Sequence, residues 1–185
     1  LRQRCLMQEA IAAPQVGGII RMTGFILKAT FLMEAAGTLF LALRFCPGMG
    51  LFPGLWCSLF HSVSAFCNAG FDLMGAAGPF SSFTNYVGDP LVCGTIMGLI
   101  VAGGIGFFTW EDLCRYRWQL HAYRLQSKLI LTITAALILL PALALYLFEF
   151  SQPRWETLTF SERLLASLFQ SVTPRTAGFN TVDLT

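Results

Sequence analysis

The stretch SLFHSVSAFCNAGF, Ser58–Phe71, decides the fold because parts of it occur twice. Its first seven residues correspond to SLFQSVT, Ser167–Thr173, at an offset of 109 positions, with five identities and a conservative Ser64/Thr173 pair. The AGF that ends it recurs at Ala177–Phe179, at an offset of 108. Two blocks in the same order indicate a repeated unit, in which a short apolar helix leads into a glycine loop. The change of offset indicates a one-residue difference between helix and loop.

The composition indicates a membrane protein. Of 185 residues, 55% are hydrophobic and 12% are charged, whereas soluble domains carry about 25% charged residues. The net charge of +2 is too small to indicate nucleic-acid binding. No secretory signal pattern is present, and because Leu1 is not a start methionine we expect an internal fragment of a longer protein. The six cysteines and two histidines lack metal-site spacing, so we expect neither a metal cluster nor an enzyme.

Three segments are predicted to cross the bilayer as helices: 24–45, 90–110 and 129–150. Two of them contain uncharged runs of 20 residues, Leu91–Trp110 and Leu129–Phe148. About 20 residues at 1.5 Å each span a hydrocarbon core of about 30 Å. Three glycines in the second segment indicate either close helix packing or a bend near the inner end of a pore; they are Gly103, Gly104 and Gly106.

Two further apolar segments, 51–66 and 160–174, are too short to span and are predicted to be re-entrant pore helices. The loops that follow them are 67–71 and 175–180, before a cut end at 181–185. Non-helical backbone at membrane depth is tolerated only where protein covers it or where it lines a water-filled path. The predicted fold class is therefore an all-α membrane protein of repeated helix–pore-loop–helix modules, similar to a potassium channel.

Lysine and arginine are unevenly distributed along the chain. Eight of the twelve lie in or next to the linkers 1–23 and 111–128, and the positive-inside rule puts these linkers in the cytoplasm. We therefore expect a multi-pass protein of the cell membrane whose short helices enter from outside. The linker 111–128 either contacts a partner or anionic lipid, or is an ordinary positive-inside loop.

The loops have side chains that are poor ligands, but their backbone carbonyls are good ones. Glycine reaches positive φ at little cost, so successive carbonyls can turn toward one axis and replace the hydration shell of a potassium ion. The C-terminal end of the preceding helix carries partial negative charge, which favours a cation. The metal expected here is potassium, bound by loop backbone only.

The segments SAFCNAGF, TPRTAGFNT and GDPLV…GGIGF..WEDL together resemble the Trk/Ktr/HKT superfamily of potassium transporters, above all the bacterial Ktr/Trk membrane subunits. The resemblance covers nearly the whole chain. It implies four pore-loop repeats around one pore, of which about one and a half are present: Ala10–Trp110 resembles the second, and Arg115–Thr185 the start of the third. The filter positions implied are Asn68, Ala69, Gly70, Phe71, Thr176, Ala177, Gly178 and Phe179.

The resemblance also implies a homodimer in a lipid bilayer and a cytosolic nucleotide-binding regulatory subunit. It implies no cofactor beyond the transported potassium, with sodium or protons as candidate coupling ions. Two loops cannot close a four-loop cage, so this segment alone is not expected to conduct. Two alternatives stay open: a sodium-conducting or non-selective transporter of the same fold, and a non-conducting membrane scaffold.

Supporting roles are assigned to Cys67, Arg175 and Glu34. Arg175 is expected to bond structural groups such as pore-helix carbonyls, because a free cation beside the path would repel ions. Glu34 is either a functional intramembrane acid or a structural hydrogen-bonding group. Asn68 and Thr176 occupy equivalent places, where they either hold the loops or, for Thr176, offer a hydroxyl oxygen to the ion.

Overall fold

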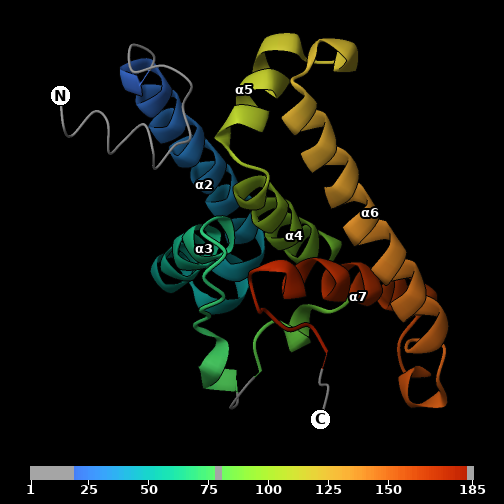
Figure 1. Cartoon of the computed structure of the whole chain (residues 1–185). Coiled ribbons are helices and arrows are strands. Elements are labelled where there is room, and N and C mark those ends of the chain that lie inside the picture. The colour runs from blue at the N-terminus through green and yellow to red at the C-terminus, as the bar shows by residue number, and fades with distance from the viewer. Residues whose placement is uncertain (1–18, 78–80, 183–185) are drawn as a thin grey trace. The chain divides into compact units, whose positions relative to one another are not determined.

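The computed structural model describes residues 19–77 and 81–182. Most of the predicted linker 1–23, and residues 183–185 of the predicted end segment, lie outside these ranges. The described residues form helices and turns without a strand, which confirms the all-α fold class. The main helices, labelled in Figure 1, are α2 (Ile19–Met49), α3 (Leu51–Phe66), α4 (Pro90–Gly104), α5 (Phe107–Tyr116), α6 (Leu125–Phe148) and α7 (Phe160–Val172). Short 3-10 turns connect them: η2 (Met74–Ala77), η3 (Thr84–Tyr86), η4 (Leu120–Ala122), η5 (Pro153–Trp155) and η6 (Thr173–Arg175).

The chain divides into two compact units, 1–33 and 34–185. The described part of the first unit is the N-terminal half of α2, with exposed apolar side chains such as Phe31 and Leu32. The second unit holds the remainder of α2 and every later helix. The packing described below concerns the second unit alone.

Among the described residues, two helices are long and apolar enough to cross a membrane, Met22–Met49 and Leu125–Phe148. The large apolar side chains of the second are exposed along much of its length, for example Leu139 and Leu140. Such exposure is costly in water but matches a hydrocarbon surrounding. The pair α4 and α5 makes a third span if the two helices count as one broken crossing.

The continuous helix predicted over 90–110 differs from the structure. Helix α4 ends at Gly104, α5 begins at Phe107, and the two are bent by 102°. Gly106 between them has a φ of 80°, which L residues with side chains rarely adopt. The indole Nε1 of Trp110 donates to the carbonyl of Ala102 across the bend, at 2.9 Å. The bend that was one explanation for the glycines therefore occurs at Gly106.

Close helix packing, the other explanation, occurs at Gly103. A Cβ atom built there would lie 1.9 Å from the carbonyl oxygen of Phe66, the last residue of α3. The missing side chain thus allows α4 to approach the end of α3. Gly37 of α2 has a similar role, since its Cβ would lie 2.4 Å from Oγ of Ser62.

The predicted linker 111–128 is mostly helical, because α5 continues to Tyr116 and α6 begins at Leu125 rather than at 129. Asp112 holds the turn between them: its Oδ2 accepts from the hydroxyl of Ser127 at 2.7 Å and from the backbone N–H of Arg124 at 3.0 Å. Helix α6 is thereby joined to α5 by a packed turn.

The starts of α4 and α7 are fixed by side-chain caps. Asp89 accepts from two backbone N–H groups of the first turn of α4, with Pro90 as the first helical residue, and pairs with Arg44 at 2.8 Å. Thr159 and Glu162 form a capping box at the start of α7. Capped in this way, α4 and α7 begin at defined residues.

Helix pairing in the second unit brings the two short helices together through α4. Helix α3 packs on α4, α6 on α7, and α4 also contacts α7, as Figure 1 shows. Behind α3 the fully buried His61 lies in edge contact with the rings of Phe45 and Phe83. This aromatic cluster, completed by Tyr86 against Phe45, connects α2, α3 and the turn η3.

Substitution of Gly103 by alanine is expected to destabilise the protein by roughly 1–3 kcal/mol, the usual cost of overpacking. The added Cβ would collide with a backbone oxygen of α3, which cannot move like a flexible side chain. The measurement is thermal unfolding of the detergent-purified protein. Gly98→Ala is the control, because that position of α4 has no atom within 4 Å of an added Cβ. Equal melting temperatures for the two variants would contradict the packing role.

Candidate functional site

The two short helices each lead into a loop that contains a glycine in the left-handed region. The φ angle is 72° at Gly70, after α3, and 90° at Gly178, after α7 and η6. Asn68 in the first loop also has a positive φ, of 53°. Asparagine is one of the few residues besides glycine that tolerate this conformation. The sequence of each loop therefore suits a backbone that turns sharply as it leaves the helix.

One residue in each repeat holds both ends of the tripeptide Ala-Gly-Phe. In the first repeat, the carbonyl of Ser64 accepts the N–H of Ala69 at 2.9 Å, and its hydroxyl donates to the carbonyl of Phe71 at 2.7 Å. In the second, the carbonyl of Thr173 accepts the N–H of Ala177 at 3.0 Å, and its hydroxyl donates to the carbonyl of Phe179 at 2.7 Å. Ser64 and Thr173 are called the bracket residues below.

The carbonyls between the two ends of the bracket are unengaged. No hydrogen bond from any residue that the structure describes reaches the backbone carbonyl oxygens of Asn68, Ala69, Gly70, Thr176, Ala177 or Gly178. Phe71 and Phe179 were also predicted as filter positions. Their carbonyls instead accept hydrogen bonds from the hydroxyls of the bracket residues. Three free carbonyls in each loop are thus available to another electropositive partner.

The two loops contact each other at equivalent positions. The hydroxyl of Thr176 donates to Oδ1 of Asn68 at 2.9 Å, across 108 positions of sequence. A Cβ atom on Gly70 would lie 1.8 Å from the carbonyl oxygen of Ala177, so the backbones also touch there. Of the two explanations offered for Asn68 and Thr176, the bond that holds the loops is present in this structure.

One further residue of each short helix, His61 in α3 and Gln170 in α7, contacts the chain that follows its loop. His61 accepts the N–H of Leu73 at Nε2, at 3.2 Å, while its Nδ1 lies 2.7 Å from the carbonyl of Cys57. This arrangement requires the proton on Nδ1 and a neutral ring. Gln170, at the equivalent position in α7, donates from Nε2 to Oδ1 of Asn180 at 3.5 Å. The same helix position therefore reaches the same part of each repeat.

The chain after the second loop is also tied to the first repeat. The N–H of Phe83 donates to the carbonyl of Asn180 at 2.7 Å, and the N–H of Asn180 donates to the hydroxyl of Ser82 at 3.1 Å. The rings of Phe83 and Phe179 are 5.4 Å apart. The two repeats are thus joined at the loops themselves as well as through α4.

Arg175 turns away from the loop that it precedes. One terminal nitrogen, Nη2, donates to the hydroxyl of Thr134 in α6 at 3.3 Å, and the other, Nη1, is buried without a partner among the described residues. The side chain borders a cavity of about 740 Å³ between α6 and α7, lined mainly by apolar groups such as Leu137 and Pro141. The structural role expected for Arg175 is thus directed at α6 rather than at pore-helix carbonyls.

The other two supporting residues donate no hydrogen bond to the free carbonyls in the part of the chain that the structure describes. Glu34 uses its backbone carbonyl, which accepts the hydroxyls of Thr38 and Ser62 at 2.7 Å each. Within the described chain, its carboxylate has no hydrogen bond or ion pair. Cys67 is an exposed free thiol that caps α3. In the described ranges no three acidic, histidine or cysteine side chains gather as a metal site.

Sequence reasoning missed the bracket residues. The repeat alignment had paired Ser64 with Thr173, and a hydroxyl retained at matching places just before two loops was the available signal. The contact of His61 with Leu73 had no such signal, because histidine and glutamine at one repeat position share no obvious chemistry.

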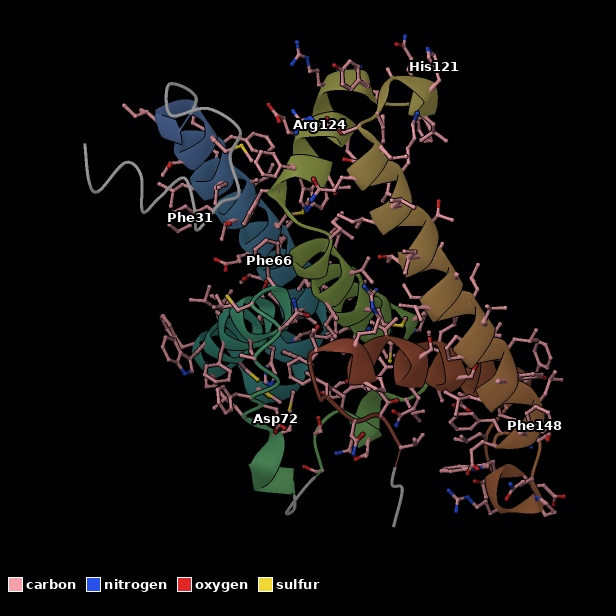
Figure 2. All side chains as sticks on the ribbon, in the orientation of Figure 1. Phe31, Phe66, Asp72, His121, Arg124 and Phe148 are labelled. Atoms are coloured by element: carbon pink, nitrogen blue, oxygen red, sulfur yellow. The ribbon has the colours of Figure 1, made fainter. Side chains whose placement is uncertain are left out.

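The basic turn between α5 and α6 lies at one end of the second unit. Arg124 and His121 are labelled in Figure 2 at the end of α6 that meets α5, whereas Phe148 lies at its other end. Asp72, which follows the first loop, is on the side of Phe148. Its Oδ1 accepts the N–H of Met74 at 3.0 Å, which closes a turn. The loops therefore lead toward the end opposite the basic turn.

Comparison with known proteins identifies relatives over nearly the whole chain. Residues 12–185 match the model of TrkH, a family described as cation transport proteins. The chain is 39% identical over 184 residues to Ktr system potassium uptake protein B of Bacillus subtilis, covering 99% of this chain and 40% of that protein. It is 38% identical to the protein of the same name from Vibrio alginolyticus, covering 100% of this chain and 40% of that protein.

A third relative is potassium/sodium uptake protein NtpJ of Enterococcus hirae, 37% identical over 97% of this chain and 39% of that protein. The chain thus spans about two fifths of the length of the curated relatives it matches. The names of these relatives refer to ion uptake, and none of them names an enzyme. The family match covers far more than half of the sequence, and the chain belongs to the TrkH family of cation transport proteins.

Proposed function

We propose that the protein of which this chain forms part takes up potassium across the cell membrane through a pore lined by loop carbonyls. One observation carries the proposal: two glycine loops at equivalent places each leave three carbonyls without a hydrogen-bond partner among the described residues. Unsatisfied backbone oxygens inside a membrane are costly. A dehydrated cation removes that cost by accepting them as ligands.

The helix ends add to this preference for a cation. Helices α3 and α7 both run into the loops with their C-terminal ends, where the aligned peptide dipoles place partial negative charge. Anions are disfavoured at such ends. Because the chain contains two loops, the proposed pore requires two further loops from the longer protein, as the family resemblance implies.

Selectivity for potassium is the finer part of the proposal. Both loops keep a glycine at the position of positive φ, and the names of the relatives from Bacillus subtilis and Vibrio alginolyticus refer to potassium uptake. The name of the Enterococcus hirae relative refers to potassium and sodium, which keeps a less selective cation transporter as the second candidate.

Orientation and partners follow from the same reasoning. The proposed cytoplasmic side is that of the basic turn between α5 and α6, and the loops enter from outside, as the positive-inside rule requires. We further propose that the pore subunit is a homodimer and works with a cytosolic nucleotide-binding regulatory subunit. Potassium is the transported ion, with sodium or protons as candidate coupling ions.

Replacing either loop glycine by serine is expected to reduce the preference for potassium over sodium, with the larger effect at Gly70. Both positions have positive φ, but only at Gly70 would the new Cβ meet a carbonyl oxygen, that of Ala177. The measurement is rubidium and sodium uptake by the full-length protein in cells that lack their own potassium uptake. Gly75→Ser is the control, since no atom lies within 4 Å of a Cβ there. An unchanged ion preference in both loop variants would count against the filter.

Orientation is tested with single cysteines in a cysteine-free background. Trp118 beside the basic turn and Ser151 beyond α6 are both exposed, so a thiol at either place is accessible to reagents. A membrane-impermeant maleimide is expected to label Ser151→Cys in intact cells and Trp118→Cys only after lysis. The opposite pattern would invert the proposed topology.

A further inference from the structure

The bracket residues hold the loops at the two points that decide where the free carbonyls lie. Each bracket begins at an alanine N–H and ends at a phenylalanine C=O. In the second repeat the N–H of Gly178 also donates to the carbonyl of Thr173, at 3.1 Å, so this added bond again runs to the bracket residue. Ser64 and Thr173 are both buried, so water cannot replace their hydroxyls. The orientation of the enclosed peptide planes therefore depends on these two residues.

The same bonds form although the repeats differ in length. The hydroxyl of Ser64 reaches a carbonyl seven residues further on, and that of Thr173 reaches one six residues further on. The one-residue difference in length falls between the bracket residue and the alanine, outside the bracketed tripeptide. The tripeptide and its two attachments are thus preserved while the connection before them changes.

Other buried hydroxyls of the short helices are used differently. Ser58 donates to the carbonyl of Gly54, and Ser171 to that of Leu168, so each bonds within its own helix. Serine in a helix commonly makes such bonds. A hydroxyl that instead leaves its helix to hold a loop carbonyl, twice and at matching positions, is specific to the bracket.

We propose that Ser64 and Thr173 are specificity-determining positioning residues for ion selection. Each hydroxyl keeps the phenylalanine carbonyl turned back toward the short helix and fixes the spacing of the three free carbonyls before it. Discrimination between potassium and sodium depends on the size of the carbonyl cage or on the number and field of its oxygens. Loss of the hydroxyl lets the end of the loop turn, which changes both quantities. This inference rests on the proposed potassium uptake.

The test compares Ser64→Ala and Thr173→Val in the full-length protein, expressed with its regulatory subunit in cells lacking their own potassium uptake. Uptake of rubidium and sodium is measured at several concentrations, and protein in the membrane is quantified. The ratio of rubidium to sodium uptake is expected to fall by roughly threefold to tenfold, the factor that one hydrogen bond contributes. Ser64→Thr and Thr173→Ser, which exchange the hydroxyls of the two repeats, are expected to retain the ratio.

Ser58→Ala and Ser171→Ala are the matched controls, since they remove buried hydroxyls from the same two helices without touching a loop. A reduced ratio in the bracket variants only, with the ratio kept in the exchange variants, would support the inference. A normal ratio in either bracket variant, even with less protein in the membrane, would show a merely structural role and overturn it. If one of the two bracket variants is not inserted into the membrane, the uptake ratio of the other variant decides the inference. Absence of rubidium uptake by the unmodified protein would instead remove the proposed function, and this inference with it.

Discussion

Backbone that leaves a helix inside a membrane must find its hydrogen-bond partners within the protein, because lipid supplies none. In the two loops, the backbone groups at the ends have hydrogen-bond partners, whereas the carbonyls in the middle have none among the described residues. The bracket residues satisfy an N–H and a C=O in each loop, and the carbonyls between them have no partner among the described residues. Secure ends and open oxygens together suit the backbone ion site proposed above. The side chains of the loop need only be small, which accounts for its plain composition.

The close packing around the loops follows from this need for secure ends. Gly103 allows α4 to reach the last carbonyl of α3, and Gly70 allows the two loops to touch at Ala177. The bond from Thr176 to Asn68 then links the loops to each other. Van der Waals contact between backbones, made possible by small residues, is the usual means by which membrane helices associate. Here it also fixes one loop relative to the next.

Much of this arrangement could be predicted from the sequence because it depends on patterns of several residues. The helix of 51–66 was visible as an apolar run that is too short to span, and the repeat identified both loops and their glycines. The 102° bend after α4 was not assigned, because an uncharged run of 20 residues gives the same hydropathy whether straight or broken. The direction of Arg175 depends on Thr134, 41 positions away, and no local pattern reports such a contact. The bracket was present in the alignment, but a hydroxyl alone does not show which carbonyl it bonds.

The position of Arg175 follows from electrostatics near a cation path. Two unit charges 4 Å apart repel by about 1 kcal/mol in water and by about 4 kcal/mol at the lower effective dielectric of a protein. An arginine directed at the free carbonyls would therefore oppose the ion that they are proposed to bind. Its guanidinium is directed at α6 instead, where it donates a hydrogen bond to the hydroxyl of Thr134. The partial negative charges of the helix ends and the open carbonyls are then left without a competing positive charge from this residue. Chain geometry and charge thus both support the occupant proposed above, a potassium ion without its water.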